Sequence, residues 1–160
     1  LTKKNKKGAY FRHIFSLELE NQVSLYFVVN VDYWVKLVLN RMNEAKNLVK
    51  KITEGIQEKK GKNIVVADLS DIDDTICNYF VICQGNSPSH VTAIVDSVKE
   101  YVRIATDNKP TAIDGLHNAQ WVAMDYSDVL VHVFLPEVRD FYNLEHLWAD
   151  AKLTYLPDLD

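Results

Sequence analysis

The segment Trp121-Val-Ala-Met-Asp-Tyr-Ser-Asp-Val-Leu-Val-His-Val-Phe-Leu135 decides the fold of this chain of 160 residues. Its two halves, residues 121–126 and 129–135, are rich in β-branched and aromatic side chains, and Ser127-Asp128 separates them. This pattern predicts two β-strands joined by a tight turn. Strands so close in sequence pair antiparallel, because a parallel return needs a crossover of about a dozen residues or more. We therefore expect the hairpin to supply the middle of a sheet.

Helices are predicted on both sides of this hairpin from apolar residues that recur every three or four positions. One begins at Met42 and ends near Gly61. A long one follows Gly85-Asn86-Ser87-Pro88, which supplies a serine for the N-cap and a proline for the first helical position. A third runs from Pro136 to about Lys152. The positions expected to be buried are Ala45, Leu48, Val49, Ile52, Ile56, Val91, Ile94, Val95, Val98, Val102, Phe141, Leu144, Leu147 and Trp148.

Further strands are expected at residues 64–69 and 78–83, with a short one at 111–114, and the tail 153–160 is expected to be non-regular. The predicted order is helix, strand, strand, helix, strand, strand, strand, helix. This order indicates an α/β fold, a mixed β-sheet of about five strands with flanking helices.

Charge divides the chain at Met42. Residues 1–41 hold seven Lys/Arg against three Asp/Glu, a net +4, whereas residues 42–160 hold eleven against nineteen, a net −8. Binding of nucleic acid depends on neutralising phosphates with basic side chains, so an acidic body does not favour it. A basic protein is the better partner, because complementary charge speeds and orients encounter.

Residues 1–41 are predicted to be an amino-terminal extension separate from a domain at residues 42–160. Their longest uncharged span, Asn21 to Val31, is too short to cross a membrane. No small-residue cleavage site of a secretory signal follows the basic start. We interpret Met42 as the natural start and the extension as upstream or added sequence. The alternative is a hydrophobic extension that docks on the domain or on a partner.

The Gly85-Asn86-Ser87 turn is the candidate for catalytic chemistry, because a glycine-rich turn before a helix is typical of phosphate binding and of nucleotidyltransferases. The paired carboxylates that would hold two metal ions are not where that chemistry needs them. Asp71 and Asp73 precede the turn, and Asp125 and Asp128 straddle another turn. We predict no catalytic residue, no metal site and no cofactor.

The histidines and cysteines indicate structural roles. No two histidines have metal-ligand spacing on one element, and His132 is expected to be a partly buried strand residue with a hydrogen-bond partner. Cys77 and Cys83 are expected to be buried thiols, which suits a reducing cytoplasm.

Three segments together resemble the ribosomal silencing factors, also called the Iojap-like family. They are Asn78-Tyr-Phe-Val-Ile-Cys-Gln-Gly-Asn-Ser87, the segment 121–134, and Arg139-Asp-Phe-Tyr-Asn-Leu-Glu-His-Leu-Trp148. The match runs in order from about Met42 to Ala151. Asn78 is a departure, because the family usually has Asp before the Tyr-Phe-Val-Ile strand, and a charge on the partner surface is lost here if that Asp supplies one.

The resemblance implies a cytoplasmic translation repressor that is not an enzyme. Members bind a ribosomal protein on the intersubunit face of the large subunit and block association with the small subunit. They are similar in fold to a nucleotidyltransferase core without its catalytic carboxylates, and they tend to be homodimers when free. The resemblance implies no binding to DNA or to a membrane. Mitochondrial and plastid relatives are linked to assembly of the large subunit.

The hairpin is the predicted partner-binding site, through Trp121, Asp125, Tyr126 and Asp128, because aromatic residues dominate interface energetics and the acidic residues suit a basic ribosomal protein. A secondary interface is predicted on the last helix at Arg139, Tyr142 and Glu145.

Structural roles for the same residues stay open. Trp121 suits the core of a strand, and the two Asp residues suit turn formation. Arg139, Tyr142, Glu145 and Trp148 suit bracing of the last helix against the sheet. Two other functions also stay open at this point. They are a nucleotidyltransferase and an RNA-binding assembly factor of the large subunit.

Overall fold

The computed structural model describes residues 23–72, 75–148 and 150–159. By its contacts the chain forms two compact units, residues 1–42 and 43–160. The described elements are α2 (Val23–Glu58), β1 (Lys62–Asp68), β2 (Tyr79–Gln84), α3 (Pro88–Thr106), β3 (Ala112–Asp114), β4 (Trp121–Asp125), β5 (Val129–Phe134), α4 (Pro136–Tyr142), α5 (Leu144–Leu147) and β6 (Lys152–Tyr155).

The strands of the larger unit form one mixed sheet in the order β3-β4-β5-β2-β1-β6. Among the described strands, β2 and β5 pair parallel, and the other neighbours pair antiparallel. The predicted hairpin is confirmed, with Trp121 opposite Phe134 and Asp125 opposite Leu130. Its second strand, β5, lies at the middle of the sheet, as expected. The six-stranded mixed sheet with flanking helices confirms the α/β fold predicted from the order of the elements, with one strand more than the five expected.

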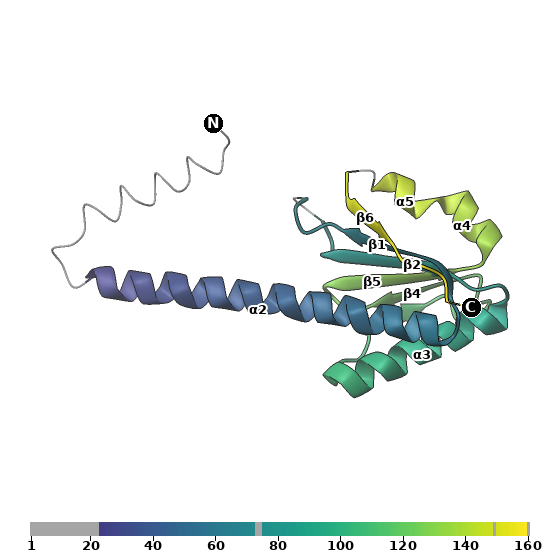
Figure 1. The fold of residues 1–160 in the computed structure, drawn as a ribbon, viewed down its shortest axis with the longest axis horizontal. Coiled ribbons are helices and arrows are strands. Elements are labelled where there is room, and N and C mark those ends of the chain that lie inside the picture. The colour runs from purple at the N-terminus through teal and green to yellow at the C-terminus, as the bar shows by residue number, and fades with distance from the viewer. Residues whose placement is uncertain (1–22, 73–74, 149, 160) are drawn as a thin grey trace. The chain divides into compact units, whose positions relative to one another are not determined.

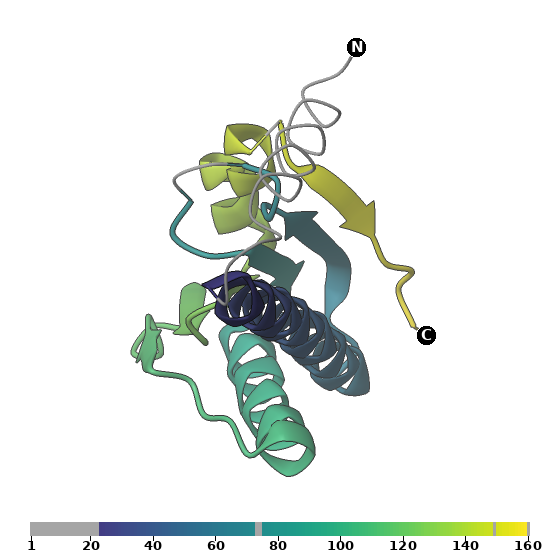
Figure 2. The same ribbon diagram turned by 90° about the vertical axis from the view of Figure 1, so that its left-hand side faces the viewer.

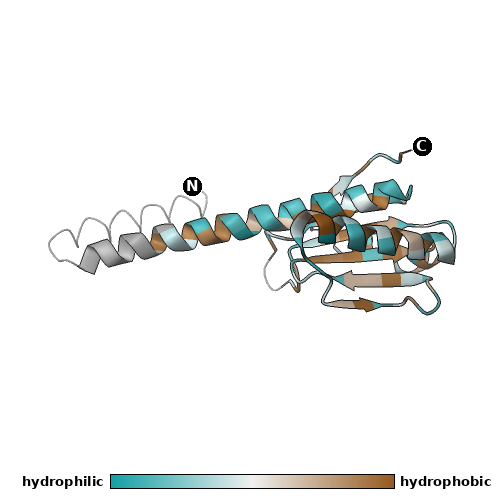
Figure 3. Cartoon of the chain, turned by 90° about the horizontal axis from the view of Figure 1, so that it is seen from below, coloured by the Kyte–Doolittle hydropathy of each residue, from teal (hydrophilic) through white to brown (hydrophobic). Residues whose placement is uncertain are grey.

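Helices cover both faces of the sheet (Figures 1 and 2). The part of α2 from Asn43 onward and α3 lie on one face, and the short helices α4 and α5 lie on the other. Every residue of α3 that is predicted to be buried is fully buried, and so are Ile52 and Ile56 of α2. Each such side chain stabilises the fold by about 1.5–3 kcal/mol through removal of its apolar surface from water. Figure 3 shows polar and apolar residues alternating along the two long helices.

The start of α3 follows the prediction from its sequence. Ser87 is the N-cap, its hydroxyl accepts a hydrogen bond from the backbone N–H of His90 at 3.2 Å, and Pro88 takes the first helical position. At the other end Asp107 has a left-handed backbone (φ 55°) and donates its N–H to the carbonyl of Arg103. Both ends therefore satisfy backbone groups that a helix leaves unpaired.

The carboxyl-terminal region differs from the prediction. One long helix was expected, but Asn143 adopts a left-handed backbone (φ 42°) that ends α4 and turns the chain into α5. This change of direction leaves Phe141 and Leu147 exposed, whereas Leu144 and Trp148 pack against the sheet as expected. The periodicity of a single helix could not place the two exposed residues correctly.

The tail forms the edge strand β6 rather than a non-regular segment. It pairs antiparallel with β1 from Asp68↔Lys152 to Val65↔Tyr155. Only Leu153 among its residues is even partly buried, so no apolar pattern marks it in the sequence. Backbone hydrogen bonds define this strand, and they extend to Leu156, whose N–H donates to the carbonyl of Ile64.

Helix α2 begins before the predicted position, at Val23 rather than at Met42. Within the described residues, no helix is both long and apolar enough to cross a membrane. The separation of an extension at 1–41 from a domain at 42–160 stays a prediction.

Candidate partner-binding surface

Trp121 lies at the start of β4, on the face of the sheet that α4 and α5 cover. Its ring stacks on Phe134, with centroids 5.1 Å apart, and tilts against Tyr142 at 4.9 Å. Its indole Nε1–H donates a hydrogen bond to Nδ1 of His132 at 3.2 Å. The side chain is half-buried, so Trp121 belongs both to the core beneath α4 and to the surface.

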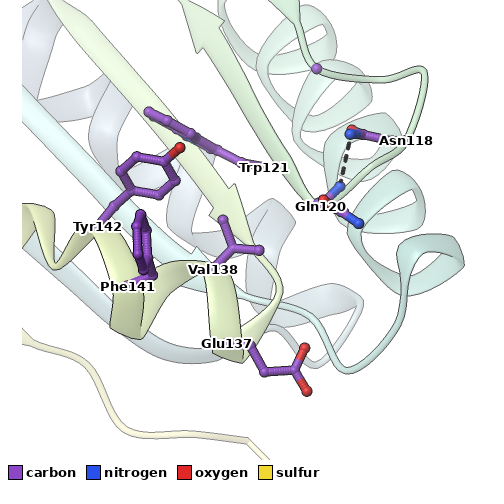
Figure 4. Close-up of a pocket in the computed structure, with 8 residues that line it drawn as sticks. Asn118, Gln120, Trp121, Glu137, Val138, Phe141 and Tyr142 are labelled. Carbon is purple, nitrogen blue, oxygen red and sulfur yellow. Dashed lines mark hydrogen bonds between the residues drawn. The ribbon is translucent and has the colours of Figure 1, made fainter.

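A groove of about 570 Å³ opens beside this tryptophan (Figure 4). One wall is the loop before β4 and the other is α4. Its lining residues are Gly115, Asn118, Gln120, Trp121, Glu137, Val138, Phe141 and Tyr142. Phe141 is 82% exposed and Tyr142 47% exposed, and their rings meet edge to face at 5.1 Å. We call these eight residues the aromatic groove.

The aromatic groove combines exposed rings with one carboxylate. Glu137 stands in the first turn of α4 and is exposed to solvent. Aromatic faces attract cations, and a neighbouring carboxylate adds charge attraction, so the groove suits a basic side chain with an apolar stem. An aromatic surface left open in this way is typical of a protein-binding site.

Gly115 lets the loop approach Trp121 closely. Its φ of +91° is a conformation that L side chains rarely adopt, and a Cβ placed on it would lie 1.9 Å from the carbonyl oxygen of Trp121. Asn118 then accepts a hydrogen bond from the N–H of Gln120 at 3.4 Å. Glycine is therefore required for this wall of the aromatic groove.

The acidic turn predicted as part of the site lies at the opposite end of β4. Asp125 accepts a hydrogen bond from the N–H of Ser127 at 2.6 Å, which is a turn-forming role. Asp128 accepts one from the side-chain amide of Asn78 at 3.1 Å. The structure therefore does not bring these two carboxylates together with Trp121.

Tyr126 is in the core rather than at the tip of the hairpin, contrary to the expectation of an exposed anchor. Only 6% of it is exposed, and it packs in the cluster beneath α2 and α3. Its hydroxyl is buried and has no hydrogen-bond partner among the described residues, and burial raises the pKa of Tyr126 to about 12. Alternation along β4 explains this location, because Tyr126 shares a face with Val122 and Met124.

The residues of the predicted secondary interface have two different roles in the structure. Arg139 is only 8% exposed; its Nε donates to Glu145 at 2.9 Å and its Nη1 donates to the carbonyl of Asn63 at 2.7 Å. Arg139 and Glu145 therefore fix α4 and α5 to the start of β1. Tyr142 instead faces Trp121 and belongs to the aromatic groove.

In the Gly85-Asn86-Ser87 turn before α3, the expected candidate for phosphate binding, the N–H groups of Gly85 and Asn86 are engaged within the protein, that of Gly85 with the carbonyl of Phe134 at 2.9 Å. The N–H of Asn86 donates to Nδ1 of His90 at 3.0 Å, and Nε2 of His90 lies 2.7 Å from the carbonyl of Lys59. Among the described residues no cluster of His, Cys, Asp or Glu could hold a metal ion. Asp71 is exposed in its loop, and Asp73 lies outside the described residues.

The two cysteines are buried free thiols, as predicted. Burial raises the pKa of both, to about 12 for Cys83, so neither is a reactive thiolate at neutral pH. His132 is also buried with a hydrogen-bond partner, as expected.

Sequence reasoning missed Glu137 and Phe141 as surface residues of the site. Both lie on α4, four positions apart and therefore on one helical face. The spacing of Glu137 and Phe141 after Pro136 is a usable signal for this face, whereas the expected longer helix turns Phe141 inward.

Comparison with known proteins gives consistent matches. A family model described as ribosomal silencing factor during starvation matches residues 42–160. The ribosomal silencing factor of Bacillus subtilis is 37% identical over 121 residues, 74% of this chain and 96% of that protein. A mouse protein named for mitochondrial assembly of the ribosomal large subunit is 37% identical over 74 residues, 45% of this chain and 32% of its own. A crystal structure from Chromobacterium violaceum superposes with a TM-score of 0.61 and 30% identity over 70% of this chain and 92% of its own.

Proposed function

The chain belongs to the ribosomal silencing factor family, and on this basis we propose that it represses translation by binding the large ribosomal subunit. In this proposal it contacts a basic ribosomal protein on the intersubunit face and sterically prevents joining of the small subunit. It acts in the cytoplasm, without cofactor or catalysis, and it is a homodimer when free.

The observation that carries the proposal is the aromatic groove. Phe141 is largely exposed within the domain, yet it stands beside Tyr142, lines the groove together with Trp121, and shares a helix face with Glu137. Burial of these rings by a partner would supply the desolvated aromatic centre on which stable interfaces depend.

Charge supports a basic occupant for this groove. Residues 42–160 carry a net charge of −8, and ribosomal proteins that contact RNA need an excess of Lys and Arg. A basic side chain entering the aromatic groove would place its stem against Phe141 and its charge near Glu137. The turn residues Asp125 and Asp128 then serve the local fold, and their charge adds to the long-range field that steers encounter.

Co-sedimentation with purified bacterial large ribosomal subunits tests the proposal. Phe141→Ala should weaken binding by about tenfold or more, as expected for an aromatic residue at the centre of an interface. Leu147→Ala is the matched control, because Leu147 is also an exposed apolar residue, at 70%, but does not line the groove. Equal binding by wild type and Phe141→Ala would place the interface elsewhere.

Assembly of the large subunit is a second candidate function, favoured by the name of the mouse relative. Both functions require binding to the large ribosomal subunit, but they have different effects on ribosomes. A silencing factor lowers the yield of joined ribosomes when added to mature subunits, whereas an assembly factor changes the accumulation of subunit precursors in cells that lack it. The N–H groups of Gly85 and Asn86 are both engaged within the protein, which does not favour a nucleotidyltransferase.

A further inference from the structure

His132 and Trp121 are diagonal neighbours on the face of the sheet beneath α4. In the register of β4 and β5, Trp121 lies opposite Phe134 and His132 lies opposite Ala123. Diagonal residues on one face of an antiparallel pair are within reach of each other when their side chains are aromatic. Their rings are 5.9 Å apart, and the indole N–H donates to Nδ1 of His132.

The surroundings of His132 leave its ring little freedom. It is 8% exposed, and the rings of Phe80 and Phe134 lie 5.4 Å and 6.1 Å from its own. Because Nδ1 accepts the indole N–H, this nitrogen carries a lone pair, so the neutral ring carries its proton on Nε2. Burial lowers the pKa of His132 to about 4, which keeps the acceptor available at neutral pH.

We infer that His132 is a positioning residue, which holds the Trp121 ring at the angle at which it lines the aromatic groove between the loop and α4. The role of Trp121 in binding rests on the proposed function. Stacking on Phe134 sets the plane of the indole, but stacking alone allows the ring to slide or flip within that plane. The single donor of the indole, directed at a fixed acceptor, selects one of those orientations.

Two substitutions of His132 separate the acceptor from the aromatic packing. His132→Phe keeps a ring of similar size between Phe80 and Phe134 but removes the acceptor. His132→Asn places an amide oxygen close to the position of Nδ1 and should restore it. The indole N–H resonance of Trp121, assigned by its loss in Trp121→Phe, reports the hydrogen bond directly. It should shift and exchange faster with water in His132→Phe, and return toward the wild-type position in His132→Asn.

Binding to purified large ribosomal subunits gives the functional readout. His132→Phe should weaken binding by about fivefold, the factor expected from one neutral hydrogen bond, and His132→Asn should recover most of it. In a Trp121→Phe background the His132→Phe substitution should have no further effect, because it acts through Trp121.

The outcomes separate the two proposals. An unchanged indole resonance in His132→Phe would overturn the positioning role whatever the binding result. A Trp121→Phe chain that binds as tightly as wild type would overturn the proposed surface, and the indole resonance would then decide the positioning role alone. Weaker binding of Trp121→Phe with unaltered binding of His132→Phe would sustain the surface and refute the inference.

Discussion

The side-chain amide of Asn78 donates a hydrogen bond of 3.1 Å to the carboxylate of Asp128, and this contact ties the start of β2 to the turn of the hairpin. The backbone reinforces it, because the carbonyl of Asp128 accepts the N–H groups of both Asn78 and Tyr79. Asp128 is therefore part of the junction between two parallel strands, and its charge is directed toward the protein rather than held free for a partner.

The first prediction concerns this junction. Asp128→Ala leaves the Asn78 amide without its acceptor, so the free energy of unfolding should fall by about 1–3 kcal/mol. Urea denaturation measures this free energy. In the Asp128→Ala background, Asn78→Ala should lower the free energy of unfolding by less than Asn78→Ala does in the wild type, because the two residues share one hydrogen bond. Strictly additive losses would show that the contact contributes nothing to stability.

The second prediction tests charge at the aromatic groove. Glu137→Lys should reduce binding to large ribosomal subunits by about tenfold or more, since a like charge would face a basic partner. Asp140→Lys is the matched control, because it makes the same charge change on the exposed surface of α4 outside the groove. Loss of binding by both variants to the same extent would indicate a general effect of net charge. The fold should be unaffected in either case.

The third prediction concerns the buried hydroxyl of Tyr126. Within the described part of the chain this donor has no acceptor, so its removal relieves a desolvation cost, and Tyr126→Phe should raise the free energy of unfolding by about 1–3 kcal/mol. Tyr79→Phe is the comparison, because the Tyr79 hydroxyl interacts with Asp68 and Ser70 and its removal should not stabilise. A lower melting temperature for Tyr126→Phe would contradict the assignment.

The burial of Tyr126 shows how much of the site was predictable. Alternation along residues 121–126 places Trp121 on one face and Tyr126 on the other, so the sequence alone contained the correct location. The aromatic character of the turn outweighed that periodicity in our prediction. The buried residues of α2 and α3 were predictable because one face of each helix is buried along its length in the larger unit.

Other features had no local signal in the sequence. The end of α4 depends on the left-handed backbone of Asn143, and β6 depends on backbone pairing with β1. The aromatic groove joins a loop to a helix that follows two strands later, so its composition follows from the tertiary fold. Arg139 was correctly considered as a brace, but its partner Asn63 is 76 residues away.

The fourth prediction follows from the pKa of His132, which burial lowers from 6.5 to about 4. Between these values the unfolded chain binds a proton that the folded chain does not, so stability falls as pH decreases through this window. Through this proton binding, His132 lowers the free energy of unfolding by about 3 kcal/mol as the pH decreases from 6.5 to 4. When wild type and His132→Asn are denatured across this pH range, the free energy of unfolding should decrease less steeply in the variant. Identical slopes would mean that His132 titrates normally in the folded state.

The last prediction concerns residues 1–41. A chain that begins at Met42 should unfold cooperatively and bind large subunits with the affinity of the full chain, because the family match starts at residue 42. Among the residues of α2 from Tyr33 onward, the first buried one is Ala45. The removed residues include exposed apolar side chains such as Trp34 and Leu39, so the shorter chain should also be more soluble. Analytical ultracentrifugation, thermal denaturation and co-sedimentation measure the three properties. Aggregation or lost binding would instead make the extension an integral part of the protein, and the domain boundary would then have to be moved toward Val23.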